Sequence, residues 1–592
     1  MNHTTATTRV LLVPELFDMV IRDMDQNTLT KAARVNKHWS GAALACLWES
    51  QVDLKPLFNL LATKGYELKD NKLVFKGLPT EQSWRRFFEY SRRIKSLKID
   101  DTEERDTFLL DTFARLRPFH IGENGNLFPS LRSLRWTGAT ETSLLHRSVL
   151  FMHPGIRKFH VTLPSSYVHT LPGDALRQYV DHVIGRMPNI AHLAVIMKGY
   201  AAVVEPSVLQ LIKGYTKTLE TLEVPKYWTS SALIEILSSL PRFRNLQIRT
   251  SEKSVGVYDP ARRFKPTLLP NVASWPSLEK LHLSAPYGEV TDFLRRNTLP
   301  PSVVELFIYT PRQESRSAVR ELCSVLARKC QSVRALRILK CMSRPLDRHI
   351  AAPVDDCLSI DDFIPLFTAI PLTEFCFHHE FPMFFKDSKV PEVAALIPNI
   401  EFLDLNSCPD YDPVTYSSGD FISLKSLSVF SKLCPQLNEM ALYIDSKNAD
   451  FTIPLPTSAP EYELFENLYI LSLGGPGLAP FDMNDTLIFL SQLLVMGCET
   501  VSATVHRSHG IHYGVQDRRH RFWSDINQRL PLLVRVRMEE EERRERLYDV
   551  IDRAEEEIRR CGGDISILDD PEQGDAGVGE SAAAPASSIS QP

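Results

Sequence analysis

Residues 278–283 read Leu-Glu-Lys-Leu-His-Leu, and the same spacing, apolar-x-x-apolar-x-apolar, recurs through most of the chain. Thirteen copies occur, with central residues Leu97, Leu134, Phe159, Leu193, Leu222, Leu246, Leu281, Leu306, Leu336, Phe375, Leu403, Met440 and Leu471. The central residue advances by about 31 residues per copy on average. A repeat of this length is typical of a solenoid, in which each unit contacts only its neighbours.

Helical patterns lie between the copies. They cover residues 174–187, 231–240, 317–330, 361–370 and 485–496. A unit of one strand and one helix cannot bury both apolar faces alone, so its neighbours must cover it. The sequence therefore predicts an α/β fold, an irregular right-handed solenoid with parallel strands inside and helices outside. An ordinary α/β domain is the alternative.

The first fifty residues predict three short amphipathic helices. Pro14 stands where the first helix would begin, Asn27 and Thr28 can cap the second, and Trp39 lies on the apolar face of the third. Three helices in about forty residues form a very small core, which predicts cover from a partner or from the next domain. A simple helical cap is the other interpretation.

Residues 9–50 resemble the F-box, whose pattern is matched by Val13-Pro14-Glu15-Leu16, Ile21, Leu29, Ala33-Arg34-Val35, Trp39 and Leu47-Trp48. Val13 replaces the usual Leu, and Asn36 replaces the Cys of many members. The resemblance implies an apolar surface that docks onto the adaptor Skp1. It assigns that role to Pro14, Leu16, Ile21, Leu29, Val35 and Trp39, for which internal packing is the alternative.

Residues 80–97 carry a second match. Trp84, Phe87, Tyr90, Arg93-Ile94 and Leu97 are similar to the linker of fungal F-box proteins with degenerate leucine-rich repeats. The Asn or Cys that ends a leucine-rich-repeat strand occurs only in scattered form, as Cys341 and Cys408. Where it is missing, buried backbone groups lose a side-chain partner, and we expect irregular curvature.

Together these patterns divide the chain. We expect a flexible N-terminus over 1–8, the F-box over 9–50, a helical linker over 51–91 and the solenoid over 92–537, followed by a charged helix over 538–561 and a disordered tail over 562–592. The charged helix has Glu–Arg and Asp–Arg pairs at i,i+4. Its apolar stripe, Leu547, Val550, Ile551, Ala554 and Ile558, is expected to cap the last repeat or else to meet another helix.

Composition excludes several classes of protein. The 592 residues hold 68 Lys and Arg against 73 Asp and Glu, a net charge of -5, which argues against a dedicated nucleic-acid binder. The ten cysteines form no CxxC pair and are typical of reduced thiols, which indicates a cytoplasmic or nuclear protein, or both. No signal layout and no apolar run of about 18 residues occurs, so we expect neither secretion nor a membrane partner.

Alternation along the strands predicts which side chains point to the inner face. They are Lys98, Arg135, His160, Ala194, Glu223, Gln247, His282, Phe307, Arg337, Cys376, Asp404, Ala441 and Ser472. Their mixed charge favours a protein partner over a phosphate backbone. The candidate substrate-binding residues are Arg135, His160, His282, Phe307, Tyr309 and Arg337, for which ordinary solvated strand positions are the alternative. Insertions over 250–275, 342–359 and 407–418 are expected at the surface.

The common catalytic motifs are missing: no HExxH, no GxSxG and no Gly-rich phosphate loop occurs. His506, His509 and His512, with His520 beyond, lack a spaced Cys or carboxylate that would complete a metal site. His378-His379-Glu380 is expected on the solenoid surface. The sequence thus predicts a chain that is not an enzyme, with no catalytic residue, no metal and no cofactor.

The F-box resemblance implies a function for this organisation. It implies the substrate-recognition subunit of an SCF-type E3 ubiquitin ligase, which joins Skp1 and, through it, a cullin to a protein substrate and so directs ubiquitin-dependent degradation. A non-degradative scaffold is the alternative. A hydrolase hidden in an α/β fold would need a convergent cluster of titratable groups.

Overall fold

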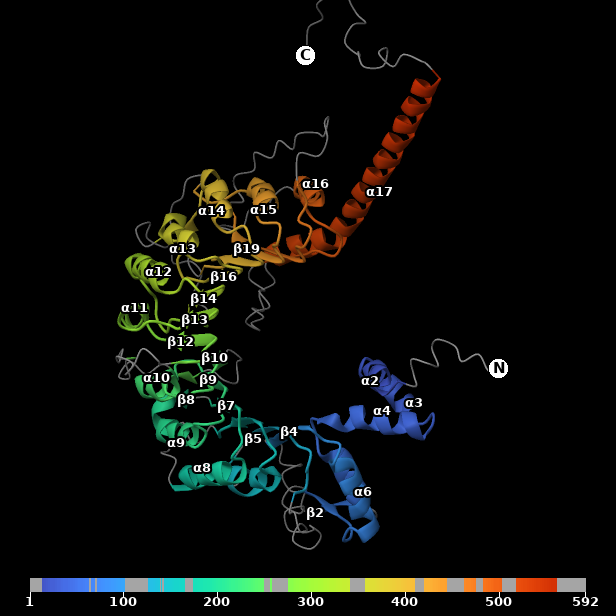
Figure 1. The fold of residues 1–592 in the computed structure, drawn as a ribbon, viewed down its shortest axis with the longest axis vertical. Helices are drawn as coiled ribbons and strands as arrows, with labels where there is room; N and C mark the ends of the chain where they lie inside the picture. Colours follow the sequence, from blue (N-terminus) through green and yellow to red (C-terminus); the bar gives the residue numbers. More distant parts are fainter. Residues whose placement is uncertain are drawn as a thin grey trace, which may run out of the picture.

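A computed structural model describes residues 13–62, 65–69, 72–101, 126–138, 140, 143–164, 174–197, 199–249, 256–257, 264, 275–340, 357–409, 420–444, 463–474, 483–502 and 518–561. The expected flexible N-terminus over 1–8 and disordered tail over 562–592 lie outside these residues, as do Cys341, His506, His509 and His512. Figure 1 shows an arc, with the strands along its inner side and helices α8 to α16 along its outer side.

One sheet of 15 parallel strands runs through the whole arc, and its spatial order follows the chain. Its strands are β1 (Ser50–Gln51), β4 (Ser96–Asp101), β5 (Ser133–Gly138), β6 (Lys158–Thr162), β7 (His192–Ile196), β9 (Thr221–Pro225), β10 (Asn245–Arg249), β12 (Lys280–Ser284), β13 (Glu305–Tyr309), β14 (Ala335–Leu339), β16 (Glu374–Phe377), β18 (Phe402–Leu405), β19 (Glu439–Tyr443), β20 (Ile470–Gly474) and β21 (Glu499–Ser502). This order confirms the predicted α/β solenoid, since neighbouring strands are also neighbours in sequence.

The repeat motif sets the register of this sheet. The thirteen central apolar residues stand opposite one another from Leu97, which pairs with Leu134, to Met440, which pairs with Leu471. Each of them is at most 1% exposed. They form a continuous buried ladder against the helices, which is the cover that a single repeat lacks.

Helices cover the outer side of this ladder. They are α8 (Asp174–Arg186), α9 (Ala201–Lys213), α10 (Ser231–Ser238), α11 (Tyr287–Arg296), α12 (Arg316–Lys329), α13 (Ile364–Ala369), α14 (Val390–Leu396), α15 (Leu427–Leu433) and α16 (Met483–Leu493). In α12, Ser315 caps the first turn by accepting a hydrogen bond from the Ala318 N–H, and the buried face includes Leu322 and Leu326. A short π-helix occurs at η2 (Ser143–Arg147). Short 3₁₀ helices occur at η3 (Ser148–Phe151), η7 (Ile360–Asp362), η8 (Asp387–Lys389) and η9 (Leu424–Ser426).

The connections also form small two-stranded sheets. They are β8 (Gly199–Tyr200) with β11 (Gly256–Val257), and β15 (Leu358–Ser359) with β17 (Met383–Phe384). Most of the three expected insertions lies outside the described residues. Phe264 and Trp275, within the first of them, are buried in the core, which corrects the expectation that the whole segment lies at the surface.

The N-terminal helices are α2 (Pro14–Arg22), α3 (Gln26–Ala32) and α4 (Lys37–Glu49). Their core is separate from that of the solenoid and consists of Phe17, Ile21, Leu29, Ala32 and Ala43. The cap of α3 is Asp25 instead of the predicted Asn27 or Thr28, because its carboxylate accepts a hydrogen bond from the Thr28 N–H at 2.7 Å. Asn36 caps α4 in the same way through the Trp39 N–H at 3.0 Å. We call these helices the three-helix unit.

The three-helix unit passes directly into the sheet. Helix α4 ends at Glu49, and the next two residues form β1, which pairs with β4. The sheet therefore begins at Ser50, before the predicted start at 92. Between β1 and β4 lie α5 (Lys55–Leu61), the hairpin β2 (Tyr66–Lys69) and β3 (Lys72–Phe75), and α6 (Glu81–Ser91), whose Trp84 and Phe87 join the solenoid core.

The C-terminal helix α17 is longer than the charge pattern predicts. It runs over Arg518–Arg560, 43 residues, and contains Pro531. Trp523, Ile526, Leu530 and Val534 are buried and pack on the last repeat, whereas the second half projects from the end of the arc (Figure 1). Leu547, Val550, Ile551 and Ile558 are 59, 54, 42 and 38% exposed, so the predicted capping by this stripe is wrong.

None of the described helices combines the length and the apolar composition that a membrane span requires.

Candidate functional site

The thirteen predicted inner-face residues form one row across the sheet. The register pairs Lys98 with Arg135 at one end and Ala441 with Ser472 at the other. Lys98 is exposed, and the half-buried members are Arg135, His160, Glu223, Gln247, Phe307 and Arg337. Ala194, His282, Cys376, Asp404, Ala441 and Ser472 are buried, which corrects the expectation that the whole row lies on an open face.

Arg135 and His160 occupy neighbouring strands at the exposed end of the row. The Arg135 Nη2 atom lies 3.5 Å from the His160 Nδ1 atom. Burial, followed by the positive charge of Arg135, lowers the pKa of His160 to about 4. His160 is therefore neutral at pH 7, and the positive charge at this end of the face belongs to Arg135 and Lys98.

An aromatic and cationic cluster lies at the middle of the row. The rings of His282 and Phe307 stack with centroids 4.2 Å apart, and the Arg337 guanidinium lies 4.8 Å from the Phe307 centroid. Tyr309 is the fourth member, with its ring centroid 6.4 Å from that of His282. The structure thus brings together His282, Phe307, Tyr309 and Arg337, which are four of the six residues that the sequence predicts to bind a substrate.

Only two members of this cluster are available to a partner. His282 and Tyr309 are 5 and 4% exposed, whereas Phe307 and Arg337 are half-buried. His282 accepts a hydrogen bond from the Ile248 N–H at 3.1 Å and lies 2.9 Å from the Glu305 carboxylate. Although burial opposes it, the contacts of His282 and Lys280 lower the pKa of Glu305 to about 2. We therefore correct the role of His282 and Tyr309 from partner contact to internal support.

Three titratable side chains converge farther along the row. Cys376 on β16 stands opposite Asp404 on β18, and His378 follows two residues after Cys376 on the same face. The His378 Nε2 atom lies 3.7 Å from the Cys376 Sγ atom and 2.7 Å from the Asp404 Oδ2 atom. The sequence placed Cys376 and Asp404 in the row but missed His378, which the i+2 rule for strands would have added.

These three residues are not arranged as a nucleophile, a base and an orienting acid. In such a relay the nucleophile and the acid contact opposite nitrogens of the imidazole ring. Here Cys376 and Asp404 both contact Nε2 of His378. Burial raises the pKa of the Cys376 thiol, which further disfavours a thiolate nucleophile.

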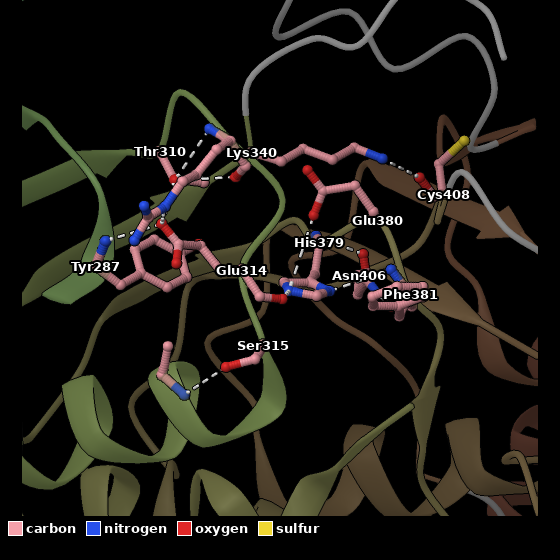
Figure 2. A network of polar contacts seen from close by, with 12 residues as sticks. Tyr287, Thr310, Glu314, Ser315, Lys340, His379, Glu380, Phe381, Asn406 and Cys408 are labelled. Carbon is pink, nitrogen blue, oxygen red and sulfur yellow. Dashed lines mark hydrogen bonds and ion pairs between the residues drawn. The ribbon is translucent and has the colours of Figure 1, made fainter. Parts of the chain in front are cut away.

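A buried polar network lies at the carboxyl ends of the strands from β12 to β18. Figure 2 shows Glu314 between Tyr287 and His379. One Glu314 carboxylate oxygen accepts hydrogen bonds from the Tyr287 N–H at 3.0 Å and the Thr310 hydroxyl at 2.8 Å, and the His379 Nε2 atom lies 3.0 Å from the Glu314 carbonyl oxygen. His379 is 0% exposed and Glu380 is 3% exposed, so the expectation that this segment lies on the surface is wrong.

Asn406 completes this network. It adopts a left-handed backbone with φ 52°, and its side-chain amide accepts from the His379 N–H at 2.9 Å and donates to the Phe381 carbonyl at 2.7 Å. Asn406 therefore satisfies the backbone of the preceding repeat, a role that the sequence analysis gave to the position of Cys408. The network supports the turns and offers no open site.

The six predicted adaptor-binding residues have different surroundings. Pro14, Leu16 and Val35 are exposed, with Leu16 at 40% and Val35 at 63%. Trp39 is half-buried, and its ring lies 5.1 Å from that of Phe17. Ile21 and Leu29 are 0 and 6% exposed in the core of the three-helix unit, so we correct their role from contact surface to internal packing.

No known family model matches the chain. No curated protein matches it either. Among solved structures, the chain is similar to the complex of Rad7 and Elc1 in yeast, with a TM-score of 0.31 and 13% identity over 78% of this chain and 92% of that chain. It is also similar to the leucine-rich repeat-containing protein LegL7 from Legionella pneumophila, with a TM-score of 0.28 and 11% identity over 64% of this chain and 91% of that chain. The solenoid architecture itself is established by the sheet topology described above.

Proposed function

We propose that this chain is the substrate-recognition subunit of an SCF-type E3 ubiquitin ligase. In this proposal the three-helix unit binds a Skp1-type adaptor and through it a cullin, while the inner face of the solenoid binds a protein substrate. The proposal places the chain in the cytoplasm, the nucleus or both. The observation that carries it is an exposed apolar surface on the three-helix unit.

These exposed apolar side chains lie on helices that already bury a core of their own. Val13, Leu16, Met19 and Val20, at the start of α2 and along it, are 41, 40, 67 and 38% exposed, whereas Phe17 and Ile21 of the same helix are buried. Val35, just after α3, is 63% exposed. Five exposed large apolar side chains on so small a unit favour burial against another protein.

The joint between the three-helix unit and the solenoid supports a bridging role. The Lys95 N–H donates to the Glu49 carbonyl at 2.8 Å, and the Lys95 ammonium lies 3.1 Å from the Glu49 carboxylate. The Trp48 and Tyr90 rings lie 4.8 Å apart across the same joint. A substrate held on the solenoid would thus keep a defined position relative to the adaptor, which raises its effective concentration at a ligase-bound E2 enzyme.

The accessible part of the inner face fits a protein substrate. Lys98, Arg135, Phe307 and Arg337 combine positive charge with an aromatic ring, and of these residue types Arg and Phe are enriched at protein interfaces. Acidic side chains such as Glu223 lie in the same row, which disfavours a nucleic-acid backbone. In this proposal the chain contributes binding and position, and catalysis belongs to other subunits.

Co-purification followed by mass spectrometry tests the proposal. The intact chain is expected to bring down a Skp1-type adaptor and a cullin, and the double variant Leu16→Asp/Val35→Asp is expected to lose both. Because these side chains are exposed, the variant should keep its fold. Val304→Asp is the matched control, since Val304 is 43% exposed on the solenoid, and it should retain the adaptor.

Two outcomes would contradict the proposal. If the folded intact chain brings down no adaptor, the three-helix unit is only a cap. If the adaptor binds but proteins held on the solenoid are never ubiquitinated in a reconstituted reaction, the chain is a non-degradative scaffold.

A further inference from the structure

Cys376, His378 and Asp404 form a cluster of metal-ligating side chains that the proposed function does not use. Their ligand atoms, one sulfur, one nitrogen and one oxygen, all lie within 4.8 Å of one another. Cys376 is 3% exposed, and the side chains of Asp404 and His378 are 0 and 15% exposed. A thiol, an imidazole and a carboxylate that converge in a buried place are the ligands that zinc and related metals prefer.

We propose that Cys376, His378 and Asp404 bind one divalent transition-metal ion, with Zn²⁺ the ion that best fits the donor set. This inference is independent of the proposed function. A thiolate and a carboxylate supply two negative charges, which balance the charge of the ion, and the neutral imidazole completes three protein ligands. Three protein ligands leave one position of a tetrahedral ion for water or another exogenous donor.

The two distances to His378 can be compared with those in a bound metal site. Bonds of about 2.3 Å to sulfur and about 2.0 Å to nitrogen or oxygen, in a tetrahedron, place ligand atoms about 3.3–3.6 Å apart. The Cys376 Sγ to His378 Nε2 distance of 3.7 Å is already close to this value. The His378 Nε2 to Asp404 Oδ2 distance of 2.7 Å is that of a hydrogen bond, and it must widen by about 0.6 Å when an ion replaces the proton between them.

Metal binding at these residues balances in protons and charge. The thiol of Cys376 loses its proton, and the proton shared by His378 and Asp404 is also released. The ion then binds the Sγ, Nε2 and Oδ2 atoms, and two protons leave for each divalent cation bound when His378 starts as an imidazolium beside the Asp404 carboxylate.

The backbone holds the three ligands before any ion binds. The His378 N–H donates to the Ile338 carbonyl at 2.9 Å, and the His378 carbonyl accepts from the Lys340 N–H at 3.1 Å. Asp404 uses Oδ1 to accept from the Ser407 N–H at 3.2 Å, which leaves Oδ2 facing His378. Such supporting hydrogen bonds orient metal ligands in known sites, and a preformed site loses little conformational freedom on binding.

Titration of the full-length, metal-free protein with Co²⁺ tests the site. We expect one Co²⁺ per chain, an absorption band of thiolate-to-cobalt charge transfer, and displacement of Co²⁺ by Zn²⁺. Cys376→Ser should abolish the charge-transfer band, while Asp404→Asn and His378→Gln should weaken binding by more than the roughly 10- to 100-fold caused by loss of an outer-shell partner. Zn²⁺ should raise the unfolding midpoint of the intact protein and not of these variants.

Cys434→Ser is the matched control. Cys434 is also buried, but its thiol donates to the carbonyl oxygens of Ala394 and Ile397. This variant should keep the cobalt band. A folded intact protein that binds no Co²⁺ would overturn the proposal, as would a charge-transfer band that survives in Cys376→Ser. If Cys376→Ser does not fold, the near-isosteric Asp404→Asn decides, and unchanged affinity in that variant would equally reject the site.

Discussion

At the scale of single residues, polar side chains satisfy backbone groups of neighbouring repeats, but not at one regular position of the repeat. Asn406 bonds the backbone of His379 and Phe381, and His282 accepts from the Ile248 N–H. Asn527 does the same at the end of the sheet, where its amide oxygen accepts from the Thr500 N–H at 2.8 Å and its NH₂ donates to the Thr500 carbonyl. The Asn527 amide thus takes the place of the peptide group of a next strand.

Asn527→Leu tests this role. It leaves the backbone groups of Thr500 without their partner, which costs about 1–3 kcal/mol for each unsatisfied group, and it exposes a strand edge that can pair with another chain. We expect a lower free energy of unfolding in urea and faster aggregation by light scattering. Gln528→Leu, on the exposed side of the same helix, is the control and should change neither.

A second prediction concerns the pKa of His160. Unfolded His160 takes up a proton near pH 6.5, whereas the folded residue resists protonation until about pH 4. The unfolded state therefore gains protons first, and His160 makes the fold less stable as the pH falls from about 6.5 to 4. His160→Gln should reduce this loss in urea unfolding measured at several pH values.

Arg135→Gln separates the two causes of that pKa shift. Removal of the neighbouring charge should raise the pKa of His160, measured by NMR with labelled histidine, but not to 6.5, because burial is the larger cause. Lys158→Gln should raise it less, since Lys158 contributes less to the shift. An unchanged pKa in Arg135→Gln would show that the charge of Arg135 does not contribute to the shift.

Residue types and strand alternation predict only part of the candidate site. Alternation is a local rule, so it placed the thirteen inner-face residues in one row and brought Phe307 next to Arg337. Burial depends on segments distant in sequence, so alternation alone predicts contact with a partner for His282 and Tyr309, which are in fact buried. His378 follows from the same alternation, but it lies beyond the end of β16, where the motif no longer marks the strand.

At the scale of elements, the sequence predicts repeated strands better than the ends of the array. All thirteen motif strands occur in register, whereas β1 and β21 were missed. Strand β1 has only two residues, and β21 carries Thr500 where the thirteen motif strands carry a large apolar residue. Pro531 lies inside α17, where a proline removes one backbone hydrogen bond, and the helix continues through it because buried residues on both sides pack on the last repeat.

The two halves of α17 should respond differently to the same substitution. Leu530 is 2% exposed and Leu547 is 59% exposed. Leu530→Ala should lower the free energy of unfolding by about 2–5 kcal/mol, and Leu547→Ala should change it by at most about 0.5 kcal/mol. Calorimetry or urea unfolding measures both. A large loss in Leu547→Ala would mean that the stripe packs on the chain after all.

At the scale of the whole molecule, the last helix of the three-helix unit runs directly into the first strand of the solenoid sheet. This continuity makes a prediction that rests on the proposed function. Insertion of a short Gly-Ser segment between Glu49 and Ser50 should separate β1 from α4 and free the unit to rotate. We expect adaptor and substrate to bind as before, but ubiquitin transfer to the substrate to slow in a reconstituted reaction. The same insertion in the projecting half of α17, after Glu545, should leave the rate unchanged.

The parallel sheet, in which each strand pairs only with its neighbours, also determines how the distance between the two ends of the arc can change. Adjacent strands in a sheet lie about 4.8 Å apart, so gain or loss of one repeat moves all later repeats by about this distance. The contacts between the remaining neighbouring repeats stay as they are. The span between the two ends of the arc can therefore vary among descendants of one ancestral chain in discrete increments. Duplication of a single repeat therefore lengthens the arc by one such increment.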